Sequence, residues 1–278
     1  MKLTLGFSPC PNDTFIFDAM VHGRIDTEGI EFEYFLADVE ELNQRAMASE
    51  VDITKISFHA YAYVASDYLI LDSGSALGRG NGPLLISKHP LDVSDLPLKR
   101  IAIPGKYTTA NLLFSIAWPD AVNKTEYLFS DIENGLLREE VDAGLIIHET
   151  RFTFEKRGLI KIADMGEYWE NLTGKPIPLG AIVIKRSVPE EMALKVNRIL
   201  RRSLEYAMKD STASYEFVSG HAREMDRAVM DSHIKLYVNE FTLNLGKEGK
   251  DAVRSLFSIA SDKRVIPSVP GRIFLLPD

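Results

Sequence analysis

The chain has 278 residues, of which 45% are hydrophobic and 26% are charged, and its formal net charge is −8. This composition is typical of a globular protein, and the length suits two lobes better than one compact unit. The negative charge argues against a nucleic-acid partner, because a surface of that kind needs clustered lysine and arginine. A single cysteine, Cys10, excludes a disulfide framework and a thiolate metal site.

The amino-terminal segment does not have the pattern of an export signal. Its apolar run is short and is followed by Pro9 and Pro11. Cys10 also lacks the hydrophobic run that a lipoprotein signal places before its cysteine. No apolar run approaches the length of a membrane-spanning helix. We therefore expect a cytoplasmic protein without membrane insertion.

The first part of the chain alternates strands with helices. The alternation of apolar residues over 3–7 indicates a strand, and the proline-stiffened turn at 8–14 leads into a helix that Asn12 or Asp13 can cap. Further strands are expected at 30–35, 51–56 and 68–72, with helices at 38–49 and 57–65. This β-α-β-α order predicts a mainly parallel sheet with helices on both faces.

A polar, proline-bearing stretch at 88–97 indicates a crossing into a second lobe. There the pattern restarts, with strands at 100–103, 126–129, 142–147 and 160–163 and helices at 108–118 and 131–140. The apolar strand 180–185 is the expected return crossing. Four helices follow, at 189–209, 211–219, 222–238 and 247–261. We predict an α/β fold in which 1–87 and 187–278 form one lobe, 88–186 form the other, and a cleft lies between them.

Ligands of open α/β sheets bind outside the carboxyl ends of the strands, where helix N-termini converge. Four loops qualify, at 8–14, 57–59, 105–111 and 148–150. In the third loop, Thr108 and Thr109 open a helix whose hydroxyl and N–H groups can hold a carboxylate. The competing interpretation for Thr108, and also for Ser57, is that the side chain only caps a helix.

His148 is the strongest single candidate for catalysis. It ends an apolar strand, so the sheet fixes its position, and an imidazole titrates near neutrality as a general acid or base requires. Glu149 can orient the ring, although adjacent strand residues point in opposite directions. The competing interpretation is a histidine that only hydrogen-bonds a loop. The histidines in helical or polar linker contexts carry no such argument: His22, His89, His221 and His233.

The glycine-rich segment 78–82 is not a phosphate-binding loop. Pro83 stands where GxGxxG needs glycine, and no GK[ST] follows. Arg79 is the one side chain there that can pair with a substrate carboxylate, and a surface arginine is the alternative. The sequence also lacks HExxH and a nucleophile elbow. We therefore expect no covalent hydrolase chemistry, and no motif supports a metal site, although one assembled from distant residues stays an open alternative.

Five segments together resemble the 1,4-dihydroxy-6-naphthoate synthase family of the futalosine menaquinone pathway. They are SPCPNDTFIFDAMVHG (8–23), DITKISFHAY (52–61), GSALGRGNGPLL (74–85), IPGKYTTANLL (103–113) and GLIIHETRFTF (144–154). The resemblance extends to about residue 186. It implies a type II periplasmic-binding-protein-like fold. It also implies a cofactor-independent lyase that acts on carbon–carbon and carbon–oxygen bonds and converts cyclic dehypoxanthine futalosine to the naphthoate.

The resemblance also implies roles for individual residues. His148 would be the catalytic base, and Thr108 and Thr109 would bind the carboxylate of a small-molecule substrate. Polar groups would line the opposite wall: Ser8, Asn12, Asp13, Thr14 and Ser57. A chorismate dehydratase-like enzyme and a non-catalytic carboxylate-binding protein remain alternatives, because the fold alone does not separate binding from catalysis. The oligomeric state stays open, with a homodimer as one option.

Overall fold

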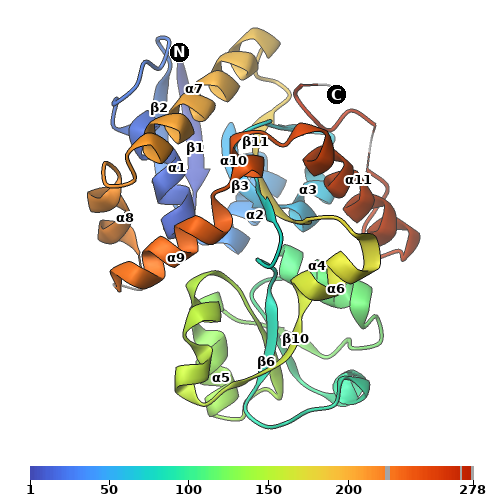
Figure 1. Ribbon diagram of the computed structural model, residues 1–278. Helices are drawn as coiled ribbons and strands as arrows, with labels where there is room; N and C mark the ends of the chain where they lie inside the picture. The colour runs from blue at the N-terminus through green and yellow to red at the C-terminus, as the bar shows by residue number, and fades with distance from the viewer. Residues whose placement is uncertain (223–225, 270, 277–278) are drawn as a thin grey trace.

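The computed structural model describes residues 1–222, 226–269 and 271–276. In this part of the chain, two sheets with flanking helices form two lobes (Figure 1). The first lobe holds a six-stranded sheet of order β2-β1-β3-β11-β4, with β5 paired to β11. Its strands are β1 (Lys2–Phe7), β2 (Glu31–Leu36), β3 (Ile53–Ser57), β4 (Tyr68–Ile70), β5 (Ala76–Gly78) and β11 (Ile177–Lys185).

The second lobe, drawn mainly in green and yellow, holds a five-stranded sheet of order β10-β6-β9-β7-β8 in the described chain. Its strands are β6 (Leu84–Ser87), β7 (Ile101–Ile103), β8 (Lys124–Glu126), β9 (Ala143–Ile146) and β10 (Ile160–Asp164). The helices of this lobe are α4 (Thr109–Ala117), α5 (Ile132–Leu137) and α6 (Met165–Thr173). Short 3-10 helices connect these elements.

The α/β class and the two-lobed fold are confirmed, but both sheets are mixed in direction. β1 pairs in parallel with β2 and β3, and β7 pairs in parallel with β8 and β9. β11 runs antiparallel to β3 and β4, and β6 runs antiparallel to β9. The antiparallel strands stand next to the points where the chain crosses between the lobes. A strand that enters a sheet from the other lobe does not follow a βαβ connection, so it does not have to run parallel to its neighbour.

The crossings lie earlier than the sequence-based boundaries at residues 87 and 187. Those boundaries place β6 in the first lobe and β11 in the second, whereas each strand is hydrogen-bonded into the other sheet. The chain therefore crosses at 79–83, before β6, and at 174–176, before β11. An apolar run marks a buried strand but does not tell which sheet the strand joins.

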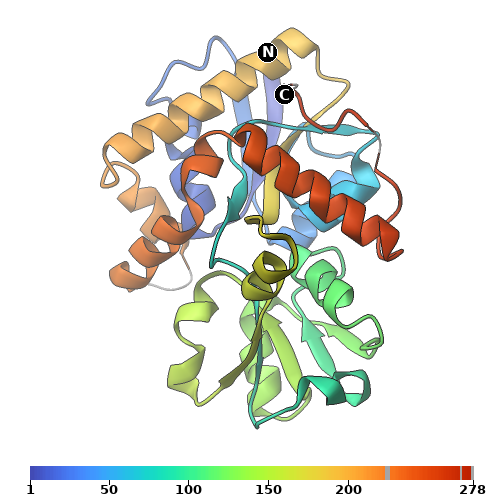
Figure 2. The same ribbon diagram turned by 45° about the vertical axis from the view of Figure 1, so that its right-hand side comes forward.

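The helices of the first lobe come from both ends of the chain (Figure 2). They are α1 (Pro11–Val21), α2 (Val39–Met47), α3 (Phe58–Val64), α7 (Glu190–Lys209), α8 (Tyr215–His221), α9 (Arg227–Tyr237), α10 (Glu240–Leu243) and α11 (Gly246–Asp262). The expected helix at 222–238 corresponds to α9, and its residues 223–225 lie outside the described chain. β5 was not predicted, because the glycines around it indicated a loop, and the four-residue helix α10 was not predicted either.

The packing of α7 shows how the amino-terminal and carboxy-terminal segments join. Its buried residues, among them Val196, Leu200 and Leu204, recur at helical spacing and share one hydrophobic cluster with Leu5 and Phe17 of β1 and α1. This packing fixes the carboxyl end of β1, and with it the loop into α1, against the carboxy-terminal helices. No helix of the described residues is long and apolar enough to cross a membrane.

Candidate active site

A cavity of about 90 Å³ lies between the lobes, and both lobes contribute side chains to its lining. The first lobe contributes Ser8, Asn12, Asp13, Lys55, Ser57, His233 and Tyr237. The second lobe contributes Thr108, Thr109, Ala110, Ile147 and His148, and Asn81 comes from the segment between β5 and β6. Of the eight residues to which the resemblance assigns roles, Thr14 is missing from this lining, and the further candidates Arg79 and Glu149 are missing as well.

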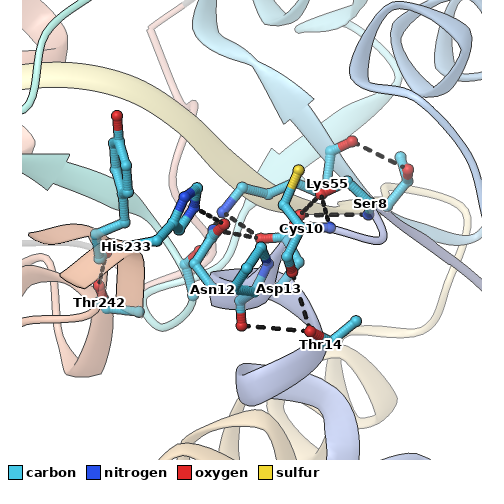
Figure 3. Close-up of polar contacts among 12 residues, drawn as sticks. Ser8, Cys10, Asn12, Asp13, Thr14, Lys55, His233 and Thr242 are labelled. Atoms are coloured by element: carbon cyan, nitrogen blue, oxygen red, sulfur yellow. Dashed lines mark hydrogen bonds and ion pairs between the residues drawn. The ribbon is translucent and has the colours of Figure 1, made fainter. Parts of the chain in front are cut away.

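Asp13 is the centre of a buried polar network in the first lobe (Figure 3). Its carboxylate accepts hydrogen bonds from Ser8 Oγ at 2.7 Å and from Asn12 Nδ2 at 2.8 Å. Lys55 Nζ lies 3.4 Å from Asp13 Oδ1 and donates to the carbonyl of Gly74 at 2.9 Å. Both charged groups are buried, and each offsets the charge of the other.

The prediction that Asn12 or Asp13 caps α1 is wrong. The helix begins at Pro11, and Cys10 is the N-cap residue without a side-chain capping bond. Proline suits the first helical position, which moves the start of the helix ahead of the two polar residues and leaves their side chains to the network. Thr14 is one residue further on, where its hydroxyl donates to the carbonyl of Cys10 at 3.0 Å instead of facing the cavity.

Thr108 and Thr109 stand at the N-terminus of α4, on the wall formed by the second lobe. Thr108 is the N-cap residue, and its Oγ accepts from the N–H of Asn111 at 3.4 Å. The two hydroxyls donate to backbone carbonyls, that of Thr108 to Gly105 at 2.8 Å and that of Thr109 to Leu179 at 2.5 Å. The donors available to an anion are therefore the first N–H groups of the helix, which have no partner within a helix.

Between the two walls, Glu40 and Asn43 of α2 contact the loop before α4. The N–H of Tyr107 donates to Glu40 at 3.1 Å, and Asn43 Nδ2 donates to Glu40 Oε2 at 3.0 Å. Asn43 Oδ1 accepts from the N–H of Ser57 at 2.9 Å, and Ser57 makes no side-chain capping bond. Burial raises the pKa of Glu40 to about 7. Gly105 passes so close that a Cβ there would lie 2.6 Å from Glu40 Oε2.

His148 follows β9 and begins the 3-10 helix His148–Phe152. Its backbone has a φ of 60°, which is uncommon for a residue other than glycine and occurs preferentially at functional sites. The edge of the Phe129 ring packs against the imidazole at 4.8 Å between ring centroids. The ring of His233 lies 6.1 Å from the His148 ring, between centroids, and is nearly parallel to it, at an angle of 10°. These contacts hold the ring at the cavity.

His233 of α9 is a second imidazole in the site and is fully buried, and sequence reasoning missed it. Its Nε2 lies 2.9 Å from Asn12 Oδ1 (Figure 3). Burial lowers the pKa of His233 well below its usual value, and the proximity of His148 and Arg151 lowers it further. His233 is separated from Asn12 by more than 200 residues of sequence, so no local pattern could reveal the contact.

Lys55 and Asn81 were also missed, whereas Arg79 faces away from the site. Lys55 is the one charged residue of the buried strand β3, and a charge in such a strand needs a partner, which was an available signal. Arg79 is exposed and pairs with Glu170 and Glu248. Within the described ranges, no group of three or more histidine, cysteine, aspartate or glutamate side chains is arranged to hold a metal ion.

The fold and the site together define a periplasmic-binding-protein-like fold with a cavity between its lobes, and several buried polar side chains stand in the wall of that cavity. The alkanesulfonate-binding protein of Xanthomonas axonopodis, solved with MOPS, has a TM-score of 0.70 to this chain at 14% identity and covers 99% of this chain and 96% of its own. A protein of Archaeoglobus fulgidus has a TM-score of 0.90 at 36% identity, with 95% of this chain and 98% of that chain covered. The first of these likenesses shows the fold alone.

The sequence comparisons are more specific. The family model described as menaquinone biosynthesis matches residues 3–262. A 1,4-dihydroxy-6-naphthoate synthase of Thermus thermophilus is 41% identical over 273 residues, which is 98% of this chain and 99% of the relative. The enzyme of the same name from Streptomyces coelicolor is 42% identical, over 96% of this chain and 95% of its own. The chain belongs to the menaquinone biosynthesis family.

Proposed function

We propose that the chain is a lyase that converts cyclic dehypoxanthine futalosine to 1,4-dihydroxy-6-naphthoate, and that it needs no metal or organic cofactor. The observation that carries the proposal is the identity of 41% over nearly the whole chain with an enzyme named for this product. The site supports it, because a histidine, a helix N-terminus and a set of buried polar groups line one cavity.

The N-terminus of α4 is the proposed site for the substrate carboxylate. The first N–H groups of a helix, which have no partner within the helix, and the positive end of the helix dipole favour an anion. Thr108 and Thr109 line the cavity there, with hydroxyls that can turn from the carbonyls of Gly105 and Leu179 toward the ligand. Ser57 lies on the facing wall, where its hydroxyl is not used as a helix cap.

His148 is the proposed base. Its neutral imidazole takes the proton from the carbon next to the substrate ketone, and the electron pair of that C–H bond moves to the ketone oxygen as an enolate. N–H and hydroxyl groups of the cavity stabilise the enolate. When the enolate re-forms the ketone, its electron pair makes a C=C bond and expels the sugar-derived part, which leaves with the electrons of the broken bond and takes the proton from the His148 imidazolium. Tautomerisation of the ketone to a phenol then makes the naphthoate ring aromatic.

The lobes have to move apart to admit a substrate of this size. The cavity of about 90 Å³ is smaller than the roughly 300–1,000 Å³ of ordinary small-molecule sites. Closure would then exclude water and bring the helix N-terminus of the second lobe toward the Asp13 network of the first lobe. The contacts of Glu40 and Asn43 with Tyr107 would form at the same step.

The test is turnover of cyclic dehypoxanthine futalosine by the purified protein in the presence of a chelator, followed by the absorbance of the naphthoate. His148→Asn is measured alongside, with binding of the naphthoate by calorimetry as the control for an intact site. We expect product from the wild type, a loss of kcat of at least about a hundredfold in the variant, and product binding in both.

Each other result points to a different conclusion. Equal turnover by His148→Asn removes the base assignment and keeps the enzyme. Consumption of chorismate in place of the futalosine derivative indicates a dehydratase. Binding of a carboxylate ligand without turnover of either compound indicates a binding protein.

A further inference from the structure

Asn81 combines complete burial with an unused hydrogen-bonding group. Its side chain is 0% exposed and lines the cavity, and neither Nδ2 nor Oδ1 has a hydrogen-bond partner within the described residues. Buried carboxamides are almost always hydrogen-bonded, so an amide that faces a cavity with both ends unpaired is suited to a polar ligand.

The backbone around Asn81 is tightly packed, which fixes the direction of this amide. A Cβ on Gly78 would lie 2.7 Å from Asn81 Nδ2, and a Cβ on Gly82 would lie 2.2 Å from the backbone nitrogen of Gly166. Arg151 Nη1 also donates to the carbonyl of Gly82 at 2.9 Å. The segment is therefore held on both sides of Asn81, and its amide is not a mobile surface group.

His233 presents an acceptor to the same cavity. Asn12 Nδ2 donates to the carboxylate of Asp13, which leaves Asn12 Oδ1 as an acceptor for His233 Nε2. The proton of the neutral ring is thus assigned to Nε2, and Nδ1 carries a lone pair. His233 is 0% exposed, and its Nδ1 has no hydrogen-bond partner in the described chain.

The two side chains line the same cavity, and their hydrogen-bonding groups together match a pair of hydroxyl groups. Asn81 Nδ2 can donate, and Asn81 Oδ1 and His233 Nδ1 can accept, whereas a carboxylate has no proton to give to either acceptor. We propose that Asn81 and His233 form a subsite for the hydroxyl groups of the sugar-derived part of the substrate, apart from the carboxylate site at α4. This inference rests on the proposed function, because that substrate supplies the hydroxyls.

The first experiment replaces Asn81 by leucine, which has the same branched arrangement of side-chain heavy atoms and no polar atoms. We expect KM for cyclic dehypoxanthine futalosine to rise at least about tenfold, while the Kd of the naphthoate product, which lacks the sugar-derived part, changes less than about twofold. Equal weakening of substrate and product, or no change in KM, would overturn the subsite.

Thermal unfolding without ligand tests the same idea independently of turnover. Because the amide of Asn81 has no hydrogen-bond partner among the residues that the structure describes, Asn81→Leu should leave Tm unchanged or raise it. The matched control is Asn197→Leu, which removes an acceptor 2.9 Å from the N–H of Asp72 in another buried site and should lower Tm. A comparable loss of Tm in both variants would mean that Asn81 has a structural role.

Two variants of His233 separate acceptance of a substrate proton from positioning of Asn12. His233→Asn places an amide oxygen near the Nδ1 position, and His233→Gln places an amide nitrogen near Nε2, next to Asn12. We expect the asparagine variant to keep a lower KM than the glutamine variant. The opposite order would assign His233 to positioning of Asn12.

Absence of turnover by the wild type would refute the proposed function and the substrate assigned to this subsite, whereas turnover with an unchanged KM in Asn81→Leu refutes the subsite alone.

Discussion

Glu40 allows a prediction about pH-dependent stability, because its carboxyl group is buried between the lobes and only 8% exposed. Burial raises the pKa of Glu40 from 4.5 to about 7, although hydrogen bonds from Asn43 and Tyr107 oppose the rise. The folded protein therefore keeps a proton on this group that the unfolded chain releases above its own pKa. The stability that this proton provides is complete below about pH 4.5 and is lost as the pH rises through 7.

The size of the effect follows from the two pKa values. One pKa unit corresponds to about 1.4 kcal/mol, so a rise from 4.5 to about 7 corresponds to about 3 kcal/mol before screening. Residual contact with solvent reduces this figure, and we expect about 2 kcal/mol. Glu40→Gln keeps the shape of the side chain and one acceptor for the N–H of Tyr107, but it cannot ionise. The free energy of unfolding of the variant therefore lacks the pH-dependent contribution of Glu40.

The assay is urea unfolding of the wild type and Glu40→Gln at about pH 5 and about pH 8.5. The free energy of unfolding of the wild type relative to Glu40→Gln should fall by about 2 kcal/mol between the two pH values. Glu41→Gln is the control on the same helix, because the exposed Glu41 side chain only pairs with Arg45 at 2.7 Å and its replacement should change the free energy of unfolding by less than about 1 kcal/mol. A difference for Glu40→Gln that stays constant between the two pH values would refute the reasoning.

Three further substitutions test other contacts of the site. Lys55→Met leaves Asp13 without its cation, and urea unfolding should show that the free energy of unfolding falls by about 3–5 kcal/mol. The added change Asp13→Asn should restore part of this loss. A loss below about 1 kcal/mol would contradict the buried pair. Gly105→Ala, at a φ of 145° and with no room for a Cβ, should cost more stability than Gly23→Ala, whose φ is 64° and whose surroundings are open; equal losses would disprove the close contact. Thr108→Val removes the N-cap acceptor of α4 and should lower the free energy of unfolding by about 1 kcal/mol and raise KM. Thr108→Ser keeps the acceptor and should keep both values close to those of the wild type. A serine variant as impaired as the valine variant would count against the cap.

The sequence predicted the parts of the site that follow strands. Ser57 comes directly at the end of β3 and His148 follows β9, and strand ends of an α/β sheet meet the ligand by topology alone. Predictions from the local sequence were wrong where the exact first residue of a helix decides the direction in which a side chain points. Thr14 was expected in the site, but α1 begins at Pro11 and not at Asp13, so Thr14 turns toward the carbonyl of Cys10.

Residues supplied by distant segments could not be predicted in the same way. His233 reaches the cavity because the carboxy-terminal helices pack on α1, and the sequence around His233 reads as an ordinary amphipathic helix. Asn81 lies in a glycine-rich segment that reads as a flexible loop, and close backbone packing of Gly82 and Gly166 is what makes it rigid. Both depend on contacts between segments that are far apart in the chain, which periodicity does not encode.

The distribution of charge around the cavity is consistent with a single group that changes its protonation state during the reaction. The proposed mechanism makes an imidazolium at His148, whose ring lies 6.1 Å from that of His233. Burial lowers the pKa of His233 well below its usual value, so His233 stays neutral and does not repel that charge. The positive charge of Lys55 is offset by Asp13, at 3.4 Å. A cationic residue in place of His233 would add a positive charge to the cavity, and a neutral residue in place of Asp13 would leave the charge of Lys55 without its partner. Each change should therefore slow proton transfer to His148. A neutral residue of similar size in place of His233 should act mainly on substrate binding.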